Sequence, residues 1–169
     1  MDDKSFFDKI YSLSDRQITK KYKYLGEGIS RKVYGIDENY VVKISKNSDG
    51  IYQNRIENYV YTHVEKDIKK YLCPILCFNP DRIIMRRAIP ICKYQKSKLV
   101  DLNEIRPEES SYNDLNELAR KFMLEYEDVI SASSWGVYNN ENVLIDYGCT
   151  SYFGDFVYSA LFRWWWNKC

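Results

Sequence analysis

The 169-residue sequence predicts an α+β fold in which strands and helices are segregated along the chain. Three observations lead to this class. Short β-prone runs separated by turn-forming residues occupy 22–45 and recur at 75–86. A long amphipathic pattern at 51–70 separates these two β regions. Helical patterns then dominate the remainder of the chain, and such an order is typical of α+β proteins.

The first β region is predicted to be an antiparallel meander that follows a short amphipathic helix over 3–13. Its strands are predicted at 22–25, 32–36 and 40–45. Gly26-Glu27-Gly28 and Asp37-Glu38-Asn39 separate them, and both segments have the composition of tight turns.

The next elements are a helix and a hairpin. The helix is predicted over 51–70, because Ile56, Val60, Val64 and Ile68 recur every four residues along one face. The hairpin joins 75–78 to 82–86 through Asn79-Pro80-Asp81. We expect one compact, two-lobed domain, with an N-terminal lobe at 1–92, a basic linker at 93–98 and a reduced C-terminal lobe at 99–169.

The C-terminal part is predicted to be mostly helical. A helix opens at Ser111, with Asp114 three residues later in an arrangement that resembles a capping box. A small hairpin follows over 136–146, and an aromatic helix is predicted over 155–168. We expect that helix to close a small core, with an exposed aromatic docking surface as the alternative. The aromatic and apolar residues concerned are Tyr158, Leu161, Phe162, Trp164 and Trp165.

Composition excludes several classes of function. The net charge of +1 provides no basic footprint for nucleic acid, and the three lysines in 93–98 are expected to be a solvated linker. The acidic start of the chain and the lack of a long apolar run predict neither a signal peptide nor a membrane anchor. Five scattered cysteines and one histidine complete no zinc site. We therefore expect a cytoplasmic protein with reduced thiols.

Three features carry candidate chemistry. Gly26 and Gly28 lie between two strands, where the lack of a Cβ lets backbone N–H groups approach phosphates. Lys43 lies inside the apolar run Val41-Val42-Lys43-Ile44 and needs a counter-charge, which Glu57 on the next helix is placed to supply. The last feature is Asp146, which follows a predicted apolar strand in Asp146-Tyr147-Gly148 and is suited to hold Mg²⁺ against phosphate oxygens.

In residue type and order, this set resembles the protein-kinase-like superfamily, over about residues 20–150. It is most similar to short, divergent kinase-like proteins of the kind that phages carry. The resemblance implies an ATP and Mg²⁺ site in which Lys43 neutralises the phosphates, Glu57 orients Lys43 and Asp146 ligates the metal. It also implies a strand and hinge at 82–90 that dock the adenine, with Met85 as gatekeeper and Arg87 beside it.

The sequence also departs from the family pattern. Arg31 replaces the third glycine and would add a charge near the phosphates. No His-Arg-Asp tripeptide is present, and Asp128 is the best candidate for the catalytic base, with a helix-end residue as the alternative. The second metal ligand falls on Ser133 or, in the other alignment, on Ser134. We expect residues 149–169 to be too few for an activation segment or a large substrate lobe.

Two functions follow from this pattern. The first is ATP-dependent transfer of a phosphoryl group to an unidentified hydroxyl acceptor. The second is a pseudokinase that keeps the fold and acts by binding or inhibiting a protein partner. Retention of Lys43, Glu57 and Asp146 favours the enzyme, and the missing metal-binding asparagine favours the pseudokinase.

Overall fold

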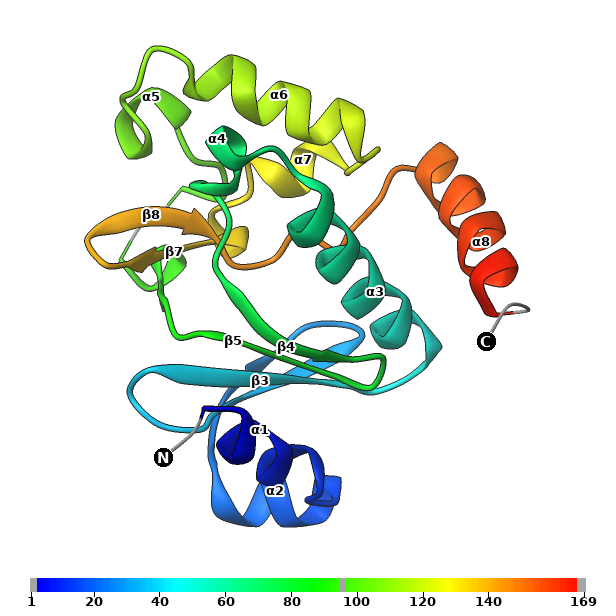
Figure 1. Cartoon of the computed structure of the whole chain (residues 1–169). Coiled ribbons are helices and arrows are strands. Elements are labelled where there is room, and N and C mark those ends of the chain that lie inside the picture. The colour runs from blue at the N-terminus through cyan, green and yellow to red at the C-terminus, as the bar shows by residue number, and fades with distance from the viewer. Residues whose placement is uncertain (1–2, 95–96, 167–169) are drawn as a thin grey trace. The chain divides into compact units, whose positions relative to one another are not determined.

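The computed structural model describes residues 3–94 and 97–166 (Figure 1). The chain forms two compact units: unit 1 comprises Met1–Asn58 and Cys73–Arg87, and unit 2 comprises Tyr59–Leu72 and Ala88–Cys169. The predicted lobes, 1–92 and 99–169, were consecutive stretches, whereas in the structure the chain passes between the units more than once. The predicted α+β class is confirmed.

Unit 1 contains a five-stranded antiparallel sheet in the order β1-β2-β3-β5-β4. The predicted meander and hairpin are both present, with ends that differ from the prediction by at most two residues. The strands are β1 (Lys23–Glu27), β2 (Arg31–Gly35), β3 (Tyr40–Ser45), β4 (Ile75–Asn79) and β5 (Arg82–Arg86).

The two faces of this sheet have different partners, because side chains alternate along each strand. One face carries Val42 and Ile84, which are paired across β3 and β5 and pack in a core with helices α1 (Asp3–Tyr11) and α2 (Asp15–Lys21). The opposite face carries Lys43 and lies toward α3 (Ser48–His63), as Figure 1 shows. The alternation therefore places Lys43 on the helix α3 side.

Helix α2 was not predicted, although the sequence contains its signal. Ser14 and Gln17 form a capping box: the Ser14 hydroxyl accepts from the Gln17 backbone N–H, and the Gln17 side chain accepts from the Ser14 backbone N–H. Ile18 is the single buried residue of α2, so the helix lacks the apolar periodicity on which the sequence prediction relied.

The prediction of one helix over 51–70 is wrong at both ends. Helix α3 begins at Ser48 and ends at His63. Glu65 then adopts an extended backbone and serves as the N-cap of α4 (Lys66–Lys69). The apolar repeat continued to Ile68 because this residue is also buried, but it belongs to the separate short helix.

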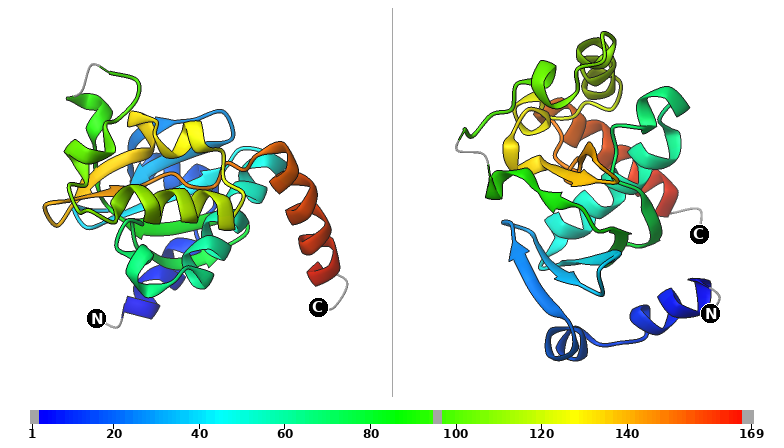
Figure 2. Two further views of the ribbon diagram at one scale, coloured as in Figure 1. Left: turned by 90° about the horizontal axis from the view of Figure 1, so that it is seen from above. Right: turned by 90° about the vertical axis from the view of Figure 1, so that its left-hand side faces the viewer.

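Unit 2 combines short helices with a three-stranded sheet in the order β6-β7-β8. The hairpin of β7 and β8 is drawn in yellow and orange in Figure 2. Strands β7 and β8 form the predicted hairpin, and Asn139 and Asn140 turn it with φ of 50° and 64°. The remaining elements are β6 (Ile89–Pro90), η1 (Ile91–Lys93), α5 (Leu102–Ile105), α6 (Ser111–Lys121), α7 (Tyr126–Val129), η2 (Ala132–Ser134), β7 (Trp135–Tyr138), β8 (Glu141–Leu144) and α8 (Tyr152–Trp166).

The predicted cap of α6 is wrong. Ser111 is the first helical residue, and its hydroxyl donates to the carbonyl of Arg106 instead of capping the helix. Ser110 takes the N-cap position, and its hydroxyl donates to Asp114 Oδ2 at 2.8 Å. The pattern therefore identified the start of the helix but not the residue that ends the preceding loop.

Arg106 is buried in unit 2 and donates hydrogen bonds to several residues. Its guanidinium donates to Glu108, to Glu141 Oε2 at 2.9 Å and to the Asn142 carbonyl at 2.9 Å. It also stacks over the ring of Tyr71, 4.6 Å from the ring centroid. Arg106 thereby ties the loop before α6 to the β7–β8 hairpin.

Helix α8 begins at Tyr152 and not at Asp155. Tyr158 and Phe162 are buried, as expected for a core, and the Tyr158 hydroxyl donates to the Phe122 carbonyl at 3.1 Å. The predicted Lys168 lies outside the described residues, and the described side chains of α8 end at Arg163, before the predicted Trp164 and Trp165. Among the described residues, no helix has the length and apolar character needed to span a membrane.

Candidate functional site

Lys43 and Glu57 form a buried ion pair in unit 1. Lys43 Nζ donates to Glu57 Oε1 at 2.8 Å and to Glu57 Oε2 at 3.1 Å. Glu57 is 0% exposed and Lys43 is 6% exposed. Lys43 extends from strand β3 on the sheet face that α3 covers. Glu57 lies on α3, about one helical turn before Val60. The predicted pairing of these two residues is confirmed.

Arg31 also contacts Glu57. Its Nη2 lies 3.0 Å from Glu57 Oε1, and its Nη1 donates to Asn54 Oδ1 at 3.3 Å. Arg31 is 4% exposed, so this guanidinium is buried with the lysine. Two cations therefore converge on one carboxylate, an arrangement that depends on every member because a buried charge is costly when its partner is removed.

The turn between β1 and β2 contains the two predicted glycines. Gly26 has a φ of +157° and lies at a bulge in the pairing of the two strands, a conformation that side-chain-bearing residues rarely adopt. A Cβ added to Gly28 would meet no atom within 4 Å, so the fold itself does not require glycine there. The Lys46 ammonium donates to the Gly28 carbonyl at 3.1 Å and holds the turn.

Met85 and Arg87 lie at the end of β5, where the resemblance places the gatekeeper and the hinge. Met85 is 1% exposed and pairs with Val41 of β3. Arg87 Nη1 donates to the Asp37 carbonyl at 2.6 Å and lies 3.5 Å from Glu38 Oε2. The Arg87 side chain is therefore anchored to the β2–β3 turn.

Asp146 and Ser134 are neighbours in unit 2. Both Ile145 N–H and Asp146 N–H donate to the Ser134 carbonyl, at 2.7 and 3.4 Å. Asp146 is exposed just beyond β8, whereas Ser134 is buried. Ser133, the alternative position, is exposed, and its hydroxyl lies 2.8 Å from that of Ser131.

Asp128 lies on α7 and contacts Cys149. Burial first, and then the hydrogen bond and the charge of Asp128, raise the pKa of the Cys149 thiol to about 12. The charges of Asp146 and Asp155 raise that pKa further. Asp128, the predicted base, and Asp146, the predicted metal ligand, are 18 residues apart in the sequence. Both nevertheless raise the pKa of the same thiol in unit 2.

The donor set fits Mg²⁺ held jointly with a nucleotide and does not fit a metal held by protein alone. Among residues 3–94 and 97–166, no three His, Cys, Asp or Glu side chains gather in a way that could hold a metal ion. Mg²⁺ commonly uses one or two carboxylates together with substrate phosphates and water. Asp146 is an exposed carboxylate suited to that role.

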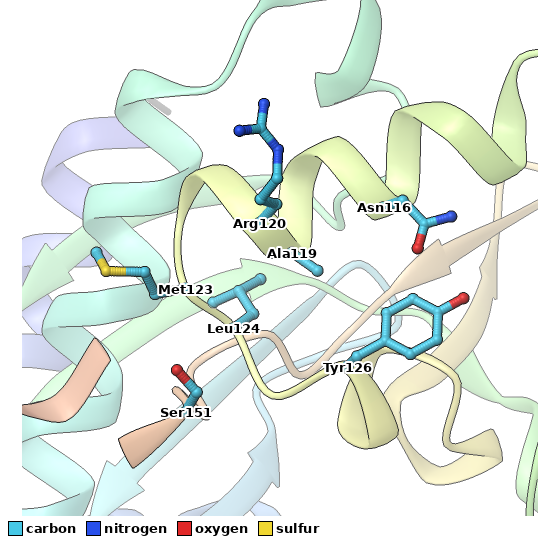
Figure 3. Close-up of a pocket in the computed structure, with 7 residues that line it drawn as sticks. All are labelled: Asn116, Ala119, Arg120, Met123, Leu124, Tyr126 and Ser151. Atoms are coloured by element: carbon cyan, nitrogen blue, oxygen red, sulfur yellow. The ribbon is translucent and has the colours of Figure 1, made fainter. Parts of the chain in front are cut away.

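A pocket of about 380 Å³ opens in unit 2. Figure 3 shows Ala119 and Leu124 between Tyr126 and Ser151. Tyr126 is two residues before Asp128, and Ser151 is two residues after Cys149. The lining residues are Asn116, Ala119, Arg120, Met123, Leu124, Tyr126 and Ser151.

No protein-family model and no curated protein sequence matches the chain. Solved structures do match it, and one of them is described as the structure of the streptomycin–ATP–APH(2'')-IIa ternary complex. That match has a TM-score of 0.42 and 17% sequence identity, and it covers 83% of this chain and 70% of the other.

Sequence reasoning missed two kinds of residue. Gln53 and Asn54 form hydrogen bonds with Ser30 and Arg31 at the end of the β1–β2 loop. They precede Glu57 by four and three residues, and this spacing places all three on the same side of α3. That spacing was the available signal. Cys149 had no comparable signal, because its contact with Asp128 depends on how the segment after β8 runs back beside α7.

Proposed function

We propose that this protein binds ATP with Mg²⁺ and transfers its terminal phosphoryl group to a hydroxyl acceptor. The observation that carries the proposal is the buried Lys43–Glu57 pair. Along the chain, the two-glycine turn comes first, then strand β3 with Lys43, and then helix α3 with Glu57. A lysine held in this way presents a fixed ammonium group to phosphate oxygens.

The turn at Gly26–Gly28 supports the same ligand. A side chain at Gly28 would meet no protein atom, so the space beside this residue is open to a ligand that approaches the backbone. In the proposal, the backbone N–H groups of the turn bind phosphate oxygens, Lys43 neutralises their charge and Met85 borders the adenine.

Unit 2 would supply the groups that act on the acceptor. Asp146 would hold Mg²⁺, which, when bound, supplies positive charge that neutralises the phosphate oxygens. Asp128 would accept the proton of the attacking hydroxyl group. The pocket of unit 2 is lined by Tyr126, two residues before Asp128 in the chain, and we assign this pocket to the acceptor.

A pseudokinase that binds a protein partner is the second candidate. The aromatic side chains at the start of α8 favour it, because Tyr152 is 92% exposed and Phe156 is 73% exposed. Exposed aromatic groups of this kind are typical of surfaces that bind other proteins.

Thermal unfolding with ATP and Mg²⁺ tests the proposal. A ligand at about 100 times its dissociation constant stabilises the folded state by about 2.7 kcal/mol, which for a chain of this size raises Tm by about 5 °C or more. We expect this increase for the wild type and for neither Lys43→Ala nor Asp146→Ala. No increase for the wild type would contradict ATP binding.

Transfer is then measured with γ-labelled ATP and a panel of small hydroxyl compounds. We expect Asp128→Asn to abolish labelling and Glu127→Gln, an exposed neighbour on α7, to leave it unchanged. An increase in Tm without any transfer would favour the pseudokinase.

A further inference from the structure

Arg31 of unit 1 lies in a different place from the one that the family pattern implies. It occupies the position of the third glycine, and the sequence suggested a charge directed at the phosphates. The guanidinium instead lies within the fold, 4% exposed, with Nη2 3.0 Å from Glu57 Oε1 and Nη1 3.3 Å from Asn54 Oδ1.

The loop that carries Arg31 is docked on helix α3 along one helical turn. Ser30 Oγ donates to Gln53 Oε1 at 2.5 Å, immediately before the Arg31 contacts with Asn54 and Glu57. A Cβ added to Gly50 would lie 2.4 Å from the Ser30 carbonyl oxygen, so the loop backbone approaches the helix as closely as glycine permits.

Glu57 therefore receives cations from two strands. Lys43 reaches it from β3, and Arg31 reaches it from β2, with both contacts on Oε1 at 2.8 and 3.0 Å. Arginine suits this position because its planar group directs two separate nitrogens, Nη2 and Nη1, to Glu57 and to Asn54, whereas an ammonium group has a single nitrogen. Asn54 is itself fixed, since its Nδ2 donates to Ser45 Oγ and to the Pro80 carbonyl at 3.0 Å each.

We propose that Arg31 is a positioning residue, which holds the Glu57 carboxylate in the orientation that fixes Lys43 for the nucleotide phosphates. The inference rests on the proposed function, because its consequence is phosphate binding by Lys43. Arg31 acts through Glu57 and makes no direct contact with the ligand. Helix α3 and the β1–β2 loop are thereby held together before the nucleotide arrives.

The test is a double-mutant cycle on ligand affinity, measured by titration calorimetry with ATP–Mg²⁺ and, separately, with adenosine. We expect Arg31→Ala to weaken ATP binding by about tenfold or more and adenosine binding by less than about twofold. Arg31→Ala combined with Glu57→Gln should bind ATP no more weakly than Glu57→Gln alone, because both substitutions break the same link. Additive losses would show that Arg31 contacts the phosphates directly and would overturn the inference.

Two further variants separate this role from a general effect on the loop. Lys32→Ala removes the exposed side chain next to Arg31 on β2 and leaves the Arg31–Glu57 contact in place, so its ATP affinity should stay within about twofold of the wild type. Arg31→Lys keeps the positive charge and one contact, and it should recover part of the ATP affinity that is lost in Arg31→Ala. If Arg31→Ala does not fold, Arg31→Lys replaces it in the double mutant with Glu57→Gln.

The possible failures are distinguishable. Wild-type protein that binds no ATP would overturn both the proposed function and this inference. Wild-type protein that binds ATP, with an Arg31→Ala variant of equal affinity, would overturn the inference alone.

Discussion

Glu57 is the buried carboxylate of unit 1 that contacts two cationic side chains. Its carboxylate is fully buried and contacts the Lys43 ammonium and the Arg31 guanidinium. Taking three charged groups out of water is costly, and their mutual attraction offsets that cost only when all of them are present. The carboxylate therefore matters for folding as well as for the proposed ligand.

We predict that Glu57→Ala lowers the free energy of unfolding by about 3–5 kcal/mol, because it leaves two buried cations without this carboxylate. Urea unfolding measures the loss. Glu38→Ala is the matched control: the Glu38 side chain is 94% exposed, and its removal should change stability by less than about 0.5 kcal/mol. Similar losses for both variants would contradict the role given to Glu57.

The Cys149 thiol reports the position of Asp128. Burial, and the hydrogen bond that the thiol donates to Asp128, raise the pKa of Cys149 to about 12 from an ordinary value of 9.0, so the thiol stays protonated across the neutral range. We predict that iodoacetamide at pH 8 modifies the exposed Cys92 much faster than Cys149, as measured by peptide mass spectrometry.

Asp128→Asn should move the pH profile of Cys149 alkylation to lower pH, since it removes a negative charge that opposes the thiolate. Glu127→Gln should leave the profile in place. If Cys149 reacts at pH 8 as fast as Cys92 in the wild type, Asp128 and Cys149 do not have the surroundings described.

At the scale of elements, the N-terminal helices depend on one side chain of the central sheet. Arg82 of β5 donates through Nη1 to the carbonyls of Ile10, Tyr11 and Leu13, at 3.3, 3.3 and 2.6 Å. Its Nη2 donates to Asp15 Oδ1 at 2.6 Å, at the start of α2. A single guanidinium thus satisfies the C-terminal end of α1 and joins it to α2.

We predict that Arg82→Ala increases hydrogen exchange throughout residues 3–21 and lowers the free energy of unfolding by about 1–3 kcal/mol, because several carbonyls lose their donor. Arg82→Lys should restore little of this, since an ammonium group cannot span the three carbonyls and Asp15. Unchanged exchange in α1 and α2 would show that these helices are held by apolar packing alone.

The elements that could be predicted from the sequence are those with a local cause. Strand β3 was predicted with the correct ends, and the Lys43–Glu57 pairing followed from strand alternation and helix periodicity. The end of α3 at His63 could not be predicted, because Ile68 continues the apolar repeat in a different helix. Arg31 could not be placed either, since its contact with Glu57 depends on how the loop folds onto α3.

At the scale of the whole molecule, the proposed chemistry is divided between the two units. Unit 1 contains Lys43, Glu57 and the two-glycine turn, and unit 2 contains Asp128, Asp146 and the pocket that we propose for the acceptor. The resemblance implies that these groups act on one nucleotide, which stays a prediction. It requires that substitutions in either unit weaken binding of the same ligand.

The central claim is that Lys43, held by Glu57, binds nucleotide phosphates. The most direct measurement is calorimetric titration of ATP–Mg²⁺ and of adenosine into Lys43→Ala and into Lys32→Ala, which removes an exposed lysine from the adjacent strand. The account predicts that Lys43→Ala loses ATP affinity by about tenfold or more and keeps its adenosine affinity, while Lys32→Ala retains both. Equal ATP affinities of Lys43→Ala and the wild type would contradict it.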